Sequence, residues 1–338
     1  MEYSLDTANT DTDNINLGSG DDILNATVDF ELYNNSIIQL GSGNDNINAL
    51  NIGLNDNAVL NTGSGNDTFN VTGIWIYGNS NVDTGSGNDI INGYIDIWDD
   101  ASLSMGSGND TIFGNLWVGS ATNVYMGDGD DLIRITGTTE TFGLYNGSNI
   151  YFGDGNDTLD SGNSVPYLQG DIFFGSGDDV FLGNYLYFSP AYSVYMGDGD
   201  DIVNTGTQGA YNFDNADFFL GSGNDTFYIR GTGEIEQVWG EADADTYIFS
   251  FVGGTTTIND FSMADGDVID ISQILTGYDP MSDLISDFVR FVDVGADAYL
   301  QVDSNGGADG FTTLVTLIGG AGLDASTLEI SGNLDTVV

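Results

Sequence analysis

The chain has 338 residues, of which 52 are acidic and only 3 are basic, with no histidine, so its formal net charge at pH 7 is −49. Such a charge excludes nucleic acid and anionic membranes as partners. The lack of histidine and lysine leaves few groups for acid–base catalysis, and we expect no enzyme. Yet 40% of the residues are hydrophobic, with 19 Phe and 17 Tyr, enough to fill a core once cations offset the charge.

The chain offers neither disulfides nor a transmembrane helix as a source of stability. It contains no cysteine, and no segment approaches 18 uninterrupted apolar residues. The first ten residues carry neither a basic region nor an apolar stretch, which argues against a Sec-type signal peptide. Bound metal ions are then the remaining cross-links that could stabilise an acidic chain.

After a short N-terminal segment, residues 1–17, a pentapeptide GSGND or a close variant occurs ten times. The copies begin at Gly18, Gly41, Gly63, Gly85, Gly106, Gly127, Gly153, Gly175, Gly197 and Gly221. Successive starts are 21 to 26 residues apart, a period typical of stacked supersecondary units. The repeat predicts an all-β parallel solenoid of about 22 residues per coil over residues 18–239.

Each motif combines two glycines with an aspartate that never varies. The glycines permit positive φ and close backbone approach, so that carbonyl oxygens can turn toward one point. A carboxylate beside them completes a shell of oxygens, which suits a hard cation such as Ca²⁺. The alternative is a polar turn without metal, since Asn, Asp and Gly favour turns.

The predicted calcium ligands are the motif aspartates and glycines. The aspartates are Asp22, Asp45, Asp67, Asp89, Asp110, Asp131, Asp157, Asp179, Asp201 and Asp225. The glycines are Gly18, Gly20, Gly41, Gly43, Gly63, Gly65, Gly85, Gly87, Gly106, Gly108, Gly127, Gly129, Gly153, Gly155, Gly175, Gly177, Gly197, Gly199, Gly221 and Gly223. The Asn that precedes the Asp in six copies is expected to face outward rather than to bind the ion.

This pattern resembles the glycine-rich repeat of RTX (hemolysin-type) proteins, which implies a parallel β-helix that binds calcium. The RTX nonapeptide places a calcium loop at both ends of each coil, whereas a step of about 22 residues leaves room for one loop per coil. We therefore expect several Ca²⁺ ions along a single edge of the solenoid.

Apolar residues recur at fixed distances from the motif. One lies two positions after the Asp, as at Leu24, Phe69, Ile91, Ile112, Ile133 and Phe227, and is expected to enter the core as part of a strand. Another lies just before the first glycine, as at Met126, Phe152, Phe174, Met196 and Leu220. Equivalent positions are expected to stack into interior ladders.

The aromatic and basic residues leave two further questions. Trp75, Trp98 and Trp117 lie 11 to 13 residues after their motif glycines. We expect them to form an interior ladder, with a sugar-binding strip as the alternative. The arginines are expected to be ion-pair anchors; they are Arg134, Arg230 and Arg290.

From about residue 240 the pattern changes. The segments WGEADADTYIF and TTTINDFSMADGDVIDIS, and the final DTVV, resemble the C-terminal targeting domain of proteins exported by type I secretion. The matching residues are Asp245, Tyr247, Phe249, Asp260, Phe261, Asp267, Ile269, Asp270, Ile271 and Ser272. The resemblance implies that residues 240–338 form an uncleaved export signal, that the type I machinery is a partner, and that the chain folds in calcium outside a Gram-negative cell.

Together these observations predict a secreted calcium-binding structural protein that assembles with copies of itself into a surface layer, filament or matrix. Two alternatives remain open. The repeats also resemble the solenoid of a calcium-bound ice-binding adhesin, although Ser replaces Thr in the motif here. A soluble secreted calcium binder is the third possibility.

Overall fold

The computed structural model describes residues 2–5, 10–11, 14–119, 121–137, 141–164, 167–183, 187–189, 192–204, 217–229, 237–253, 256–307 and 310–337. It is all-β apart from two short helical segments in these ranges, and it forms a parallel solenoid of about ten turns with about 22 residues per turn. The predicted fold class is confirmed. The chain divides into two compact units, Met1–Ser176 and Gly177–Val338, which are described separately.

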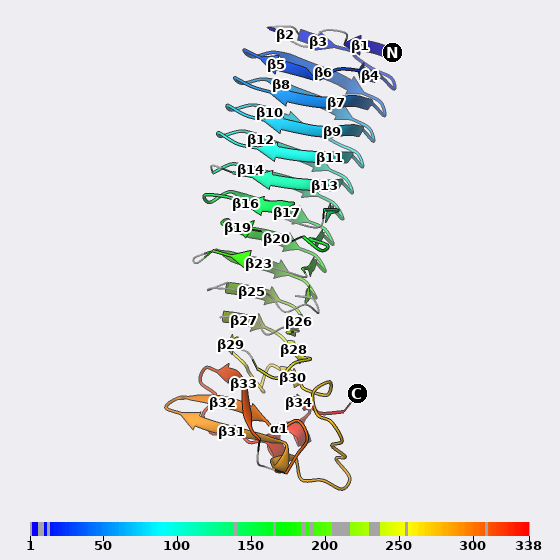
Figure 1. Cartoon of the computed structure of the whole chain (residues 1–338). Helices are drawn as coiled ribbons and strands as arrows, with labels where there is room; N and C mark the ends of the chain where they lie inside the picture. Colours follow the sequence, from blue (N-terminus) through cyan, green and yellow to red (C-terminus); the bar gives the residue numbers. More distant parts are fainter. Residues whose placement is uncertain are drawn as a thin grey trace. The chain divides into compact units, whose positions relative to one another are not determined.

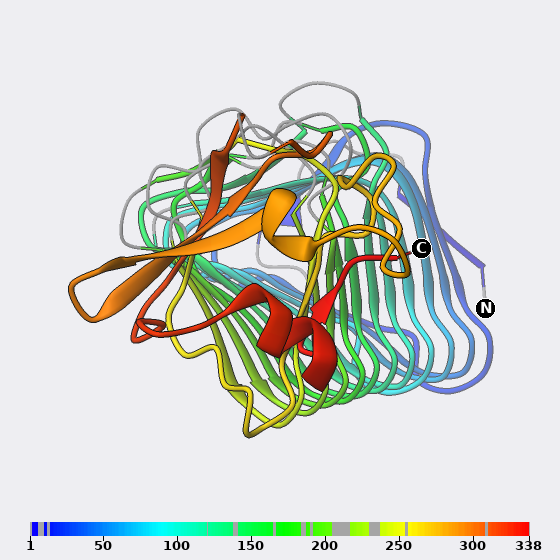
Figure 2. The same cartoon turned by 90° about the horizontal axis from the view of Figure 1, so that it is seen from below.

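Each coil of the first unit contributes strands to two parallel sheets, one on either side of the motif (Figure 1). Sheet A follows the motif and comprises β1 (Glu2–Leu5), β2 (Thr10–Asp11), β4 (Ile23–Ala26), β5 (Phe30–Tyr33), β7 (Asn46–Leu54), β9 (Thr68–Ile76), β11 (Ile90–Ile97), β13 (Thr111–Val118), β15 (Leu132–Ile135), β16 (Phe142–Leu144), β18 (Thr158–Asp160) and β19 (Tyr167–Leu168). Sheet B precedes the motif and comprises β3 (Asn14–Asn16), β6 (Ile37–Ser42), β8 (Val59–Ser64), β10 (Asn81–Asp83), β12 (Ser102–Ser107), β14 (Asn123–Asp128), β17 (Asn149–Asp154) and β20 (Ile172–Ser176). Seen from below, the coils of this unit have similar outlines and lie one behind another (Figure 2).

The sequence makes these coils through alternation and through two kinds of turn. In β9 the apolar Phe69, Ile74 and Ile76 are buried while polar neighbours face outward. The chain leaves sheet A at a pair of Asn or Asp residues with positive φ, such as Asp56 and Asn57, a conformation these side chains tolerate. It leaves sheet B at the motif glycines.

The predicted interior ladders are confirmed within the described residues. The six apolar residues that follow the motif Asp are fully buried, and those that precede the first glycine are at most 1% exposed. Phe152 and Phe174 stack with ring centroids 4.7 Å apart. Side chains of one position therefore pack against the same position in the next coil.

The motif glycines are required because successive loops nearly touch. Gly65 has a φ of +120°, and a Cβ added there would lie 1.9 Å from the carbonyl oxygen of Gly43 in the preceding coil. Gly63 has the same relation to Gly41, with a separation of 1.9 Å. The glycines thus combine a left-handed backbone with close contact between coils.

In the second unit the parallel pairing continues. Its sheet A comprises β21 (Val180–Leu182), β22 (Tyr187–Phe188), β24 (Ile202–Asn204), β26 (Thr226–Ile229), β28 (Thr246–Phe249), β30 (Val268–Asp270) and β34 (Leu334–Asp335). Its sheet B comprises β23 (Ser193–Asp198), β25 (Asp217–Ser222), β27 (Gln237–Ala242), β29 (Thr256–Ile258), β33 (Thr312–Leu317), β32 (Asp297–Val302) and β31 (Val289–Val294). Parallel pairing runs from β28 to β30 and from β30 to β34, so coil-like structure extends past residue 240.

The C-terminal part of this unit ends the parallel order. Strand β33 pairs parallel with β29 but antiparallel with β32, which in turn pairs antiparallel with β31. The 3-10 helix η1 (Ile285–Asp287) and the helix α1 (Ala325–Ser331) complete it. Asp324 caps α1 by accepting a hydrogen bond from the Thr327 N–H.

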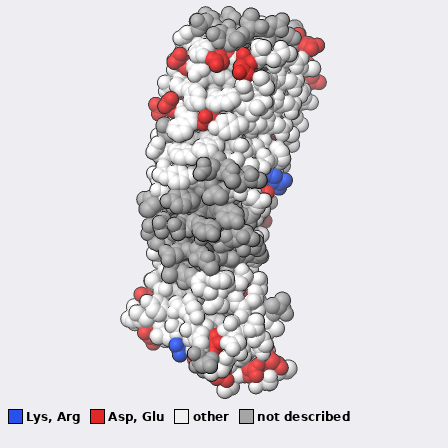
Figure 3. Space-filling model, viewed as in Figure 1, with Lys and Arg blue, Asp and Glu red and all other residues white. Residues whose placement is uncertain are grey.

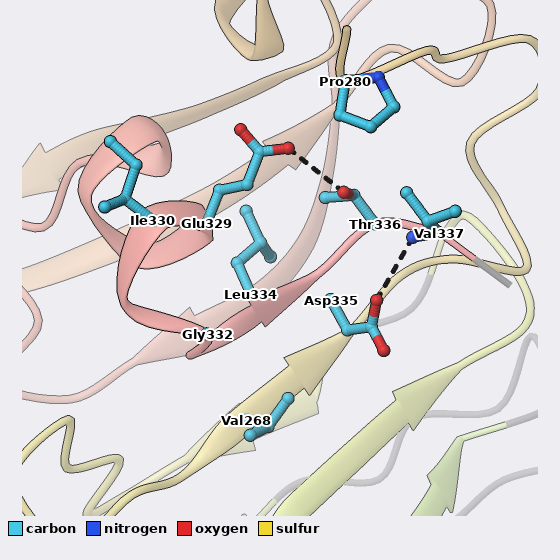
Figure 4. A pocket seen from close by; sticks show the side chains of 9 residues that line it. All are labelled: Val268, Pro280, Glu329, Ile330, Gly332, Leu334, Asp335, Thr336 and Val337. Atoms are coloured by element: carbon cyan, nitrogen blue, oxygen red, sulfur yellow. Dashed lines mark hydrogen bonds between the residues drawn. The ribbon is translucent and has the colours of Figure 1, made fainter.

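A shallow hollow of about 670 Å³ lies where the tail passes α1 (Figure 4). Glu329 accepts hydrogen bonds there from the hydroxyls of Thr336, at 3.1 Å, and Tyr278, at 2.5 Å. The Thr336 bond holds the C-terminal segment against the helix, and the Tyr278 bond ties the helix to an earlier loop. Within the described ranges no helix is long and apolar enough to cross a membrane.

The interior position expected for the tryptophans is wrong. Trp75 and Trp117 alternate with the buried residues of β9 and β13 and lie half-buried on the outer face of sheet A. Both pair in register with Asp96 of β11, whereas Trp98 lies two residues beyond Asp96. Equal distances from the motif do not correspond to equal positions in the strands, because the coils differ in length. The tryptophans were therefore assigned to the wrong face of the sheet.

We predict that Gly65→Ala destabilises the solenoid far more than Gly20→Ala. Both glycines have positive φ, +120° and +104°, so both substitutions carry the left-handed penalty of about 1–2 kcal/mol. Only Gly65 has a backbone atom in the way; nothing lies within 4 Å of a Cβ at Gly20. Urea unfolding followed by circular dichroism at fixed calcium should show an extra loss of at least about 2 kcal/mol for Gly65→Ala, and equal losses would contradict the close contact between coils.

Candidate metal centre

The motif aspartates form a continuous ladder inside each unit. The backbone N–H of each donates a hydrogen bond to the Oδ1 of the next coil's aspartate, at 2.7 Å for Asp45 to Asp67 and for Asp67 to Asp89. In the first unit the ladder runs from Asp22 to Asp157 at 2.7–2.8 Å. In the second unit it begins with Asp179, which donates to Asp201 at 2.7 Å. All ten motif aspartates are at most 2% exposed.

A second ladder of side chains lies beside the first and runs in the opposite direction. The backbone N–H of Asn66 donates to Oδ1 of Asn44 in the preceding coil at 2.8 Å, and that of Asn88 donates to Asn66 at 2.9 Å. These asparagines are exposed, as predicted. An amide oxygen is thus sufficient to accept a backbone N–H between coils.

The buried row differs because each carboxylate has a second oxygen that the ladder does not use. Among the described residues, the Oδ2 atoms of seven motif aspartates are buried and accept no hydrogen bond. They belong to Asp45, Asp67, Asp89, Asp110, Asp131, Asp201 and Asp225. An ionised group in this state would carry an uncompensated charge, and a protonated one would carry a hydroxyl without an acceptor.

Burial shifts the titration of this row upward. Burial raises the pKa of Asp131 to about 8, and the negative charges of Asp157 and Asp110 add to the rise, while the hydrogen bond from the Asp110 N–H opposes it. Burial likewise raises the pKa of Asp89 to about 7 and that of Asp201 to about 8. The folded protein without cations therefore holds carboxyl groups that are partly protonated near neutral pH.

The donor set around the row consists of oxygens. Each loop supplies the carboxylate and its own carbonyls, and some of these carbonyls are already engaged, as where Gly18 O accepts the Ser42 N–H at 3.0 Å. In the described part of the chain no three carboxylates gather into one cluster. An ion held here would therefore take much of its shell from backbone carbonyls, which Ca²⁺ accepts readily. The residues present fit a hard cation.

Two members of the ladder carry no GSGND motif and were not predicted as ligands. The Asp225 N–H donates to Asp245 at 3.0 Å, and the Asp245 N–H donates to Asp267 at 3.1 Å. Burial raises the pKa of Asp245 to about 8. The available signal was the spacing of Asp225 and Asp245, 20 residues, combined with the alternating pattern TYIF that follows.

The coil at Asp245 lacks the motif glycines. Glu241 pairs in register with Gly221, and Glu241 and Asp243 adopt positive φ of 69° and 75°. Asp260 accepts hydrogen bonds from the N–H groups of Gly240 and Glu241 at 3.0 and 2.9 Å. These bonds support a loop that glycine would otherwise form without strain.

Two of the three arginines, Arg134 and Arg290, lie among the described residues. Arg134 forms an ion pair with Asp160 at 3.1 Å, as predicted. Arg290 instead donates to Gln301 at 2.8 Å and lies over the ring of Phe311, 4.1 Å from its centroid. Arg230 falls outside the described residues.

The surface of Figure 3 is mostly neither acidic nor basic over the described part, although the chain carries 52 acidic residues. Part of the explanation is that the ladder takes its carboxylates inside. No model of a known protein family matches the sequence, and the curated proteins include no significant match. The RTX resemblance therefore stands on the motif itself.

We predict that without divalent cations the free energy of unfolding falls as pH rises from 5 to 8. The unfolded aspartates titrate near their ordinary pKa of about 3.9. Between pH 5 and 8 the folded state keeps protons on these carboxyl groups that the unfolded state has already lost. The folded-state pKa values lie at about 6 to 8. The stability that these protons confer is therefore lost as the pH rises through that range. Urea unfolding at several pH values in chelator measures the slope.

A matched pair of variants separates the buried row from general charge. Asp131→Asn should flatten the slope, because its group no longer titrates. Asp130→Asn removes an equal charge from the exposed neighbouring row, where asparagine stands in other coils. Because the charge of Asp130 adds only a minor part to the raised pKa of Asp131 and Asp157, this variant should flatten the slope less than Asp131→Asn does. Equal slopes in the two variants would show that the buried row does not control the pH dependence.

Proposed function

We propose that this protein is a secreted structural solenoid that folds on Ca²⁺ outside a Gram-negative cell and assembles with copies of itself. Calcium would bind along the aspartate ladder through the motif carboxylates and loop carbonyls. The role would be mechanical rather than catalytic. The observation that carries the proposal is the second, unused oxygen of the buried aspartates.

That oxygen favours a cation site over a structural turn. Asn44 and Asn66 show that an amide satisfies the hydrogen bond between coils. Aspartate nevertheless occupies all ten buried positions, where its charge is costly unless compensated. A bound cation would satisfy the free oxygen and neutralise the charge together, whereas protonation would do only the second.

Calcium would also link secretion to folding. A chain with a net charge of −49 resists compaction until cations bind. Extracellular calcium modules have dissociation constants of roughly 10⁻⁴ to 10⁻³ M, so such a chain would stay unfolded in the calcium-poor cytoplasm and fold after export. The resemblance of residues 240–338 to type I targeting domains supports this order of events.

Coil-to-coil pairing supports assembly. In the first unit, among the described residues, β1, β2 and β3 pair in parallel register with β4, β5 and β6. Strand edges of this kind can pair with another chain as well as with a coil of their own chain. A coil of a second copy could therefore continue the stack.

A second candidate function rests on the outer rows of the motif. Ser42, Ser64, Ser86 and Ser107 lie in register, two residues from the asparagine row. The two rows form a regular array of the kind found in the ice-binding adhesin that the repeats resemble. Asp128 and Asp154 then continue the serine row with charges, which disfavours ice binding. Thermal hysteresis measured in calcium decides this alternative.

We predict that Ca²⁺ raises the free energy of unfolding and that the gain is larger at pH 8 than at pH 5, because protons and calcium compete for the same carboxylates. Calcium titration followed by circular dichroism measures both. Asp131→Asn should reduce the calcium-dependent increase in the free energy of unfolding by the contribution of one site, and Asp130→Asn should reduce it much less. Absence of any calcium effect at pH 8 would contradict the proposed function.

Assembly is tested separately, on the calcium-loaded protein. Negative-stain microscopy and analytical ultracentrifugation should show filaments or sheets that disperse when calcium is chelated. A folded, calcium-bound monomer at high concentration would remove assembly from the proposal and leave a soluble calcium binder.

A further inference from the structure

A hollow of about 270 Å³ lies on the outer face of sheet A in the first unit. It arises because one position in a row across the sheet has no side chain. Glu31 of β5, Gly53 of β7 and Trp75 of β9 are successive members of that row. Neighbouring strands lie about 4.8 Å apart, so Gly53 leaves a gap one strand wide between the carboxylate and the indole. We call this gap the Gly53 hollow.

The indole of Trp75 presents one side to the hollow. Its ring lies over Gly73, since a Cβ at Gly73 would be 2.5 Å from it. Tyr94 of the following coil pairs with Gly73 and contacts the ring from that side, with 5.9 Å between the ring centroids. In the preceding coil the residue paired with Gly73 is Asn51, which has no ring. In the described part of the chain no second ring stacks on Trp75, and it lines the hollow together with Tyr77.

Hydrogen-bond acceptors surround the hollow. Asp29 and Glu31 contribute carboxylates, and the lining includes no basic residue. The side chain of Asn51 donates to Asp29 at 2.8 Å, which orients both groups. The oxygen of the same Asn51 amide is buried and accepts no hydrogen bond within the described residues. A buried acceptor in this state is stabilised by a ligand that donates a hydrogen bond.

The lining offers few donors to balance these acceptors. The hydroxyl of Tyr33 donates to Glu31, and that of Tyr77 donates to Asp96 at 2.9 Å. Among the lining side chains this leaves N–H groups of the two asparagines. The Tyr33 bond also holds the Glu31 carboxylate in place before any ligand arrives. The hollow therefore fits a ligand that donates hydrogen bonds and carries positive charge.

We propose that the Gly53 hollow binds the ammonium group of a small primary amine. An ammonium carries three donors and no acceptor, so it is complementary to Asp29, Glu31 and the oxygen of Asn51. The carbon chain next to the ammonium would lie against the indole of Trp75, and a cation close to an aromatic ring gains further attraction. Aromatic walls with a few oriented polar groups are typical of small-ligand sites.

Other classes of ligand fit less well. The two carboxylates repel anions. Ca²⁺ takes about six to eight oxygen ligands, and the aromatic side of the hollow supplies none. The hollow lies on the outer face of sheet A, away from the motif loops, so the proposal goes beyond the proposed function and does not depend on calcium binding along the aspartate ladder.

Isothermal titration calorimetry on the full-length chain in calcium tests the proposal. Salt at about 0.15 M screens general attraction to the acidic surface. The probe is n-butylammonium. Tetramethylammonium has the same charge without N–H donors, and n-butanol has the same carbon chain without charge. n-Butylammonium should bind at one site with a Kd in the millimolar range or below, and both controls should bind at least about tenfold more weakly. No binding of n-butylammonium, or equal binding of tetramethylammonium, would overturn the proposal.

A second probe distinguishes two sources of the same ammonium group. Nα-acetyl-lysine methylamide presents the side chain that a partner protein would offer. Weak binding of this probe beside strong binding of n-butylammonium would identify a free amine as the ligand. Comparable binding of both would support the ammonium site and include lysine side chains among its ligands.

Variants locate the site. Glu31→Gln keeps the shape and removes the charge, and it should weaken binding by about tenfold through loss of a charge-assisted hydrogen bond. Gly53→Leu fills the gap and should abolish measurable binding; the nearest atom to a Cβ there is in the flexible side chain of Glu31, at 3.1 Å. The control is Asp83→Asn on sheet B, where the carboxylate also accepts from an asparagine, Asn61, at 2.8 Å. It should leave affinity within about twofold. Circular dichroism confirms that each variant folds.

The outcomes differ from those of the calcium proposal. Binding that Asp83→Asn weakens as much as Glu31→Gln would reflect surface charge alone and reject the ammonium site. Calcium that displaces n-butylammonium, with one ion fewer bound by Glu31→Gln, would identify a metal site and also reject it. Calcium-dependent folding without amine binding would reject this inference and leave the proposed function intact. Amine binding by a chain that folds without any effect of calcium would do the reverse.

Discussion

A buried row of carboxylates, one per coil, is the constraint on which the rest of this structure depends. Each aspartate accepts a backbone N–H from the preceding coil at 2.7–2.8 Å through the first unit, so the row fixes the register of the stack. The same side chains bring negative charge into the buried interior, where it destabilises unless it is compensated. The fold thus gains its order from groups whose charge opposes folding.

The glycines and the exposed asparagines follow from this row. To bring carboxylates of successive coils within hydrogen-bond distance, the loops must approach until the carbonyl of Gly43 faces the Cα of Gly65, which excludes any Cβ. The asparagine row ties the same loops together in the opposite direction, with the N–H of Asn66 donating to Asn44 at 2.8 Å. Two opposed ladders link the loops, and in seven motif aspartates of the described part they leave the second carboxylate oxygen buried and without a hydrogen bond.

Much of this architecture could be predicted from the sequence, because the repeat varies least at the loop residues that the close contact between coils constrains most. The fixed spacing of Gly, Gly and Asp predicted the solenoid, the coil length and the interior position of residues such as Phe69. Outside the loop the constraint is weaker, and prediction failed accordingly. Trp98 was aligned with Trp75 by its distance from the motif, yet coils of unequal length place it two residues further along the strand. Whether a side chain faces outward depends on its place in the alternating pattern of its strand, and not on its distance from the motif.

The C-terminal part shows a second limit. Asp245 joins the ladder although Glu241 and Asp243 replace the motif glycines. Non-glycine residues can adopt positive φ when neighbours support the loop, and here the side chain of Asp260 provides that support. A motif defined by its glycines could not reveal a coil stabilised by a distant carboxylate. The resemblance to export domains drew attention to Asp245 and Asp267, but their place in the ladder required the structure.

The most direct test of this account is the calcium content of the folded chain. Protein stripped with chelator would be refolded at pH 8 and brought to equilibrium by dialysis against millimolar calcium, and the excess calcium on the protein side would be measured by inductively coupled plasma mass spectrometry. A row of cation sites along the ladder predicts on the order of one ion for each of the ten motifs. A chain that reaches the same fold at pH 8 with no bound calcium, or with a single ion, would show that cations do not neutralise the buried aspartates and would contradict the account.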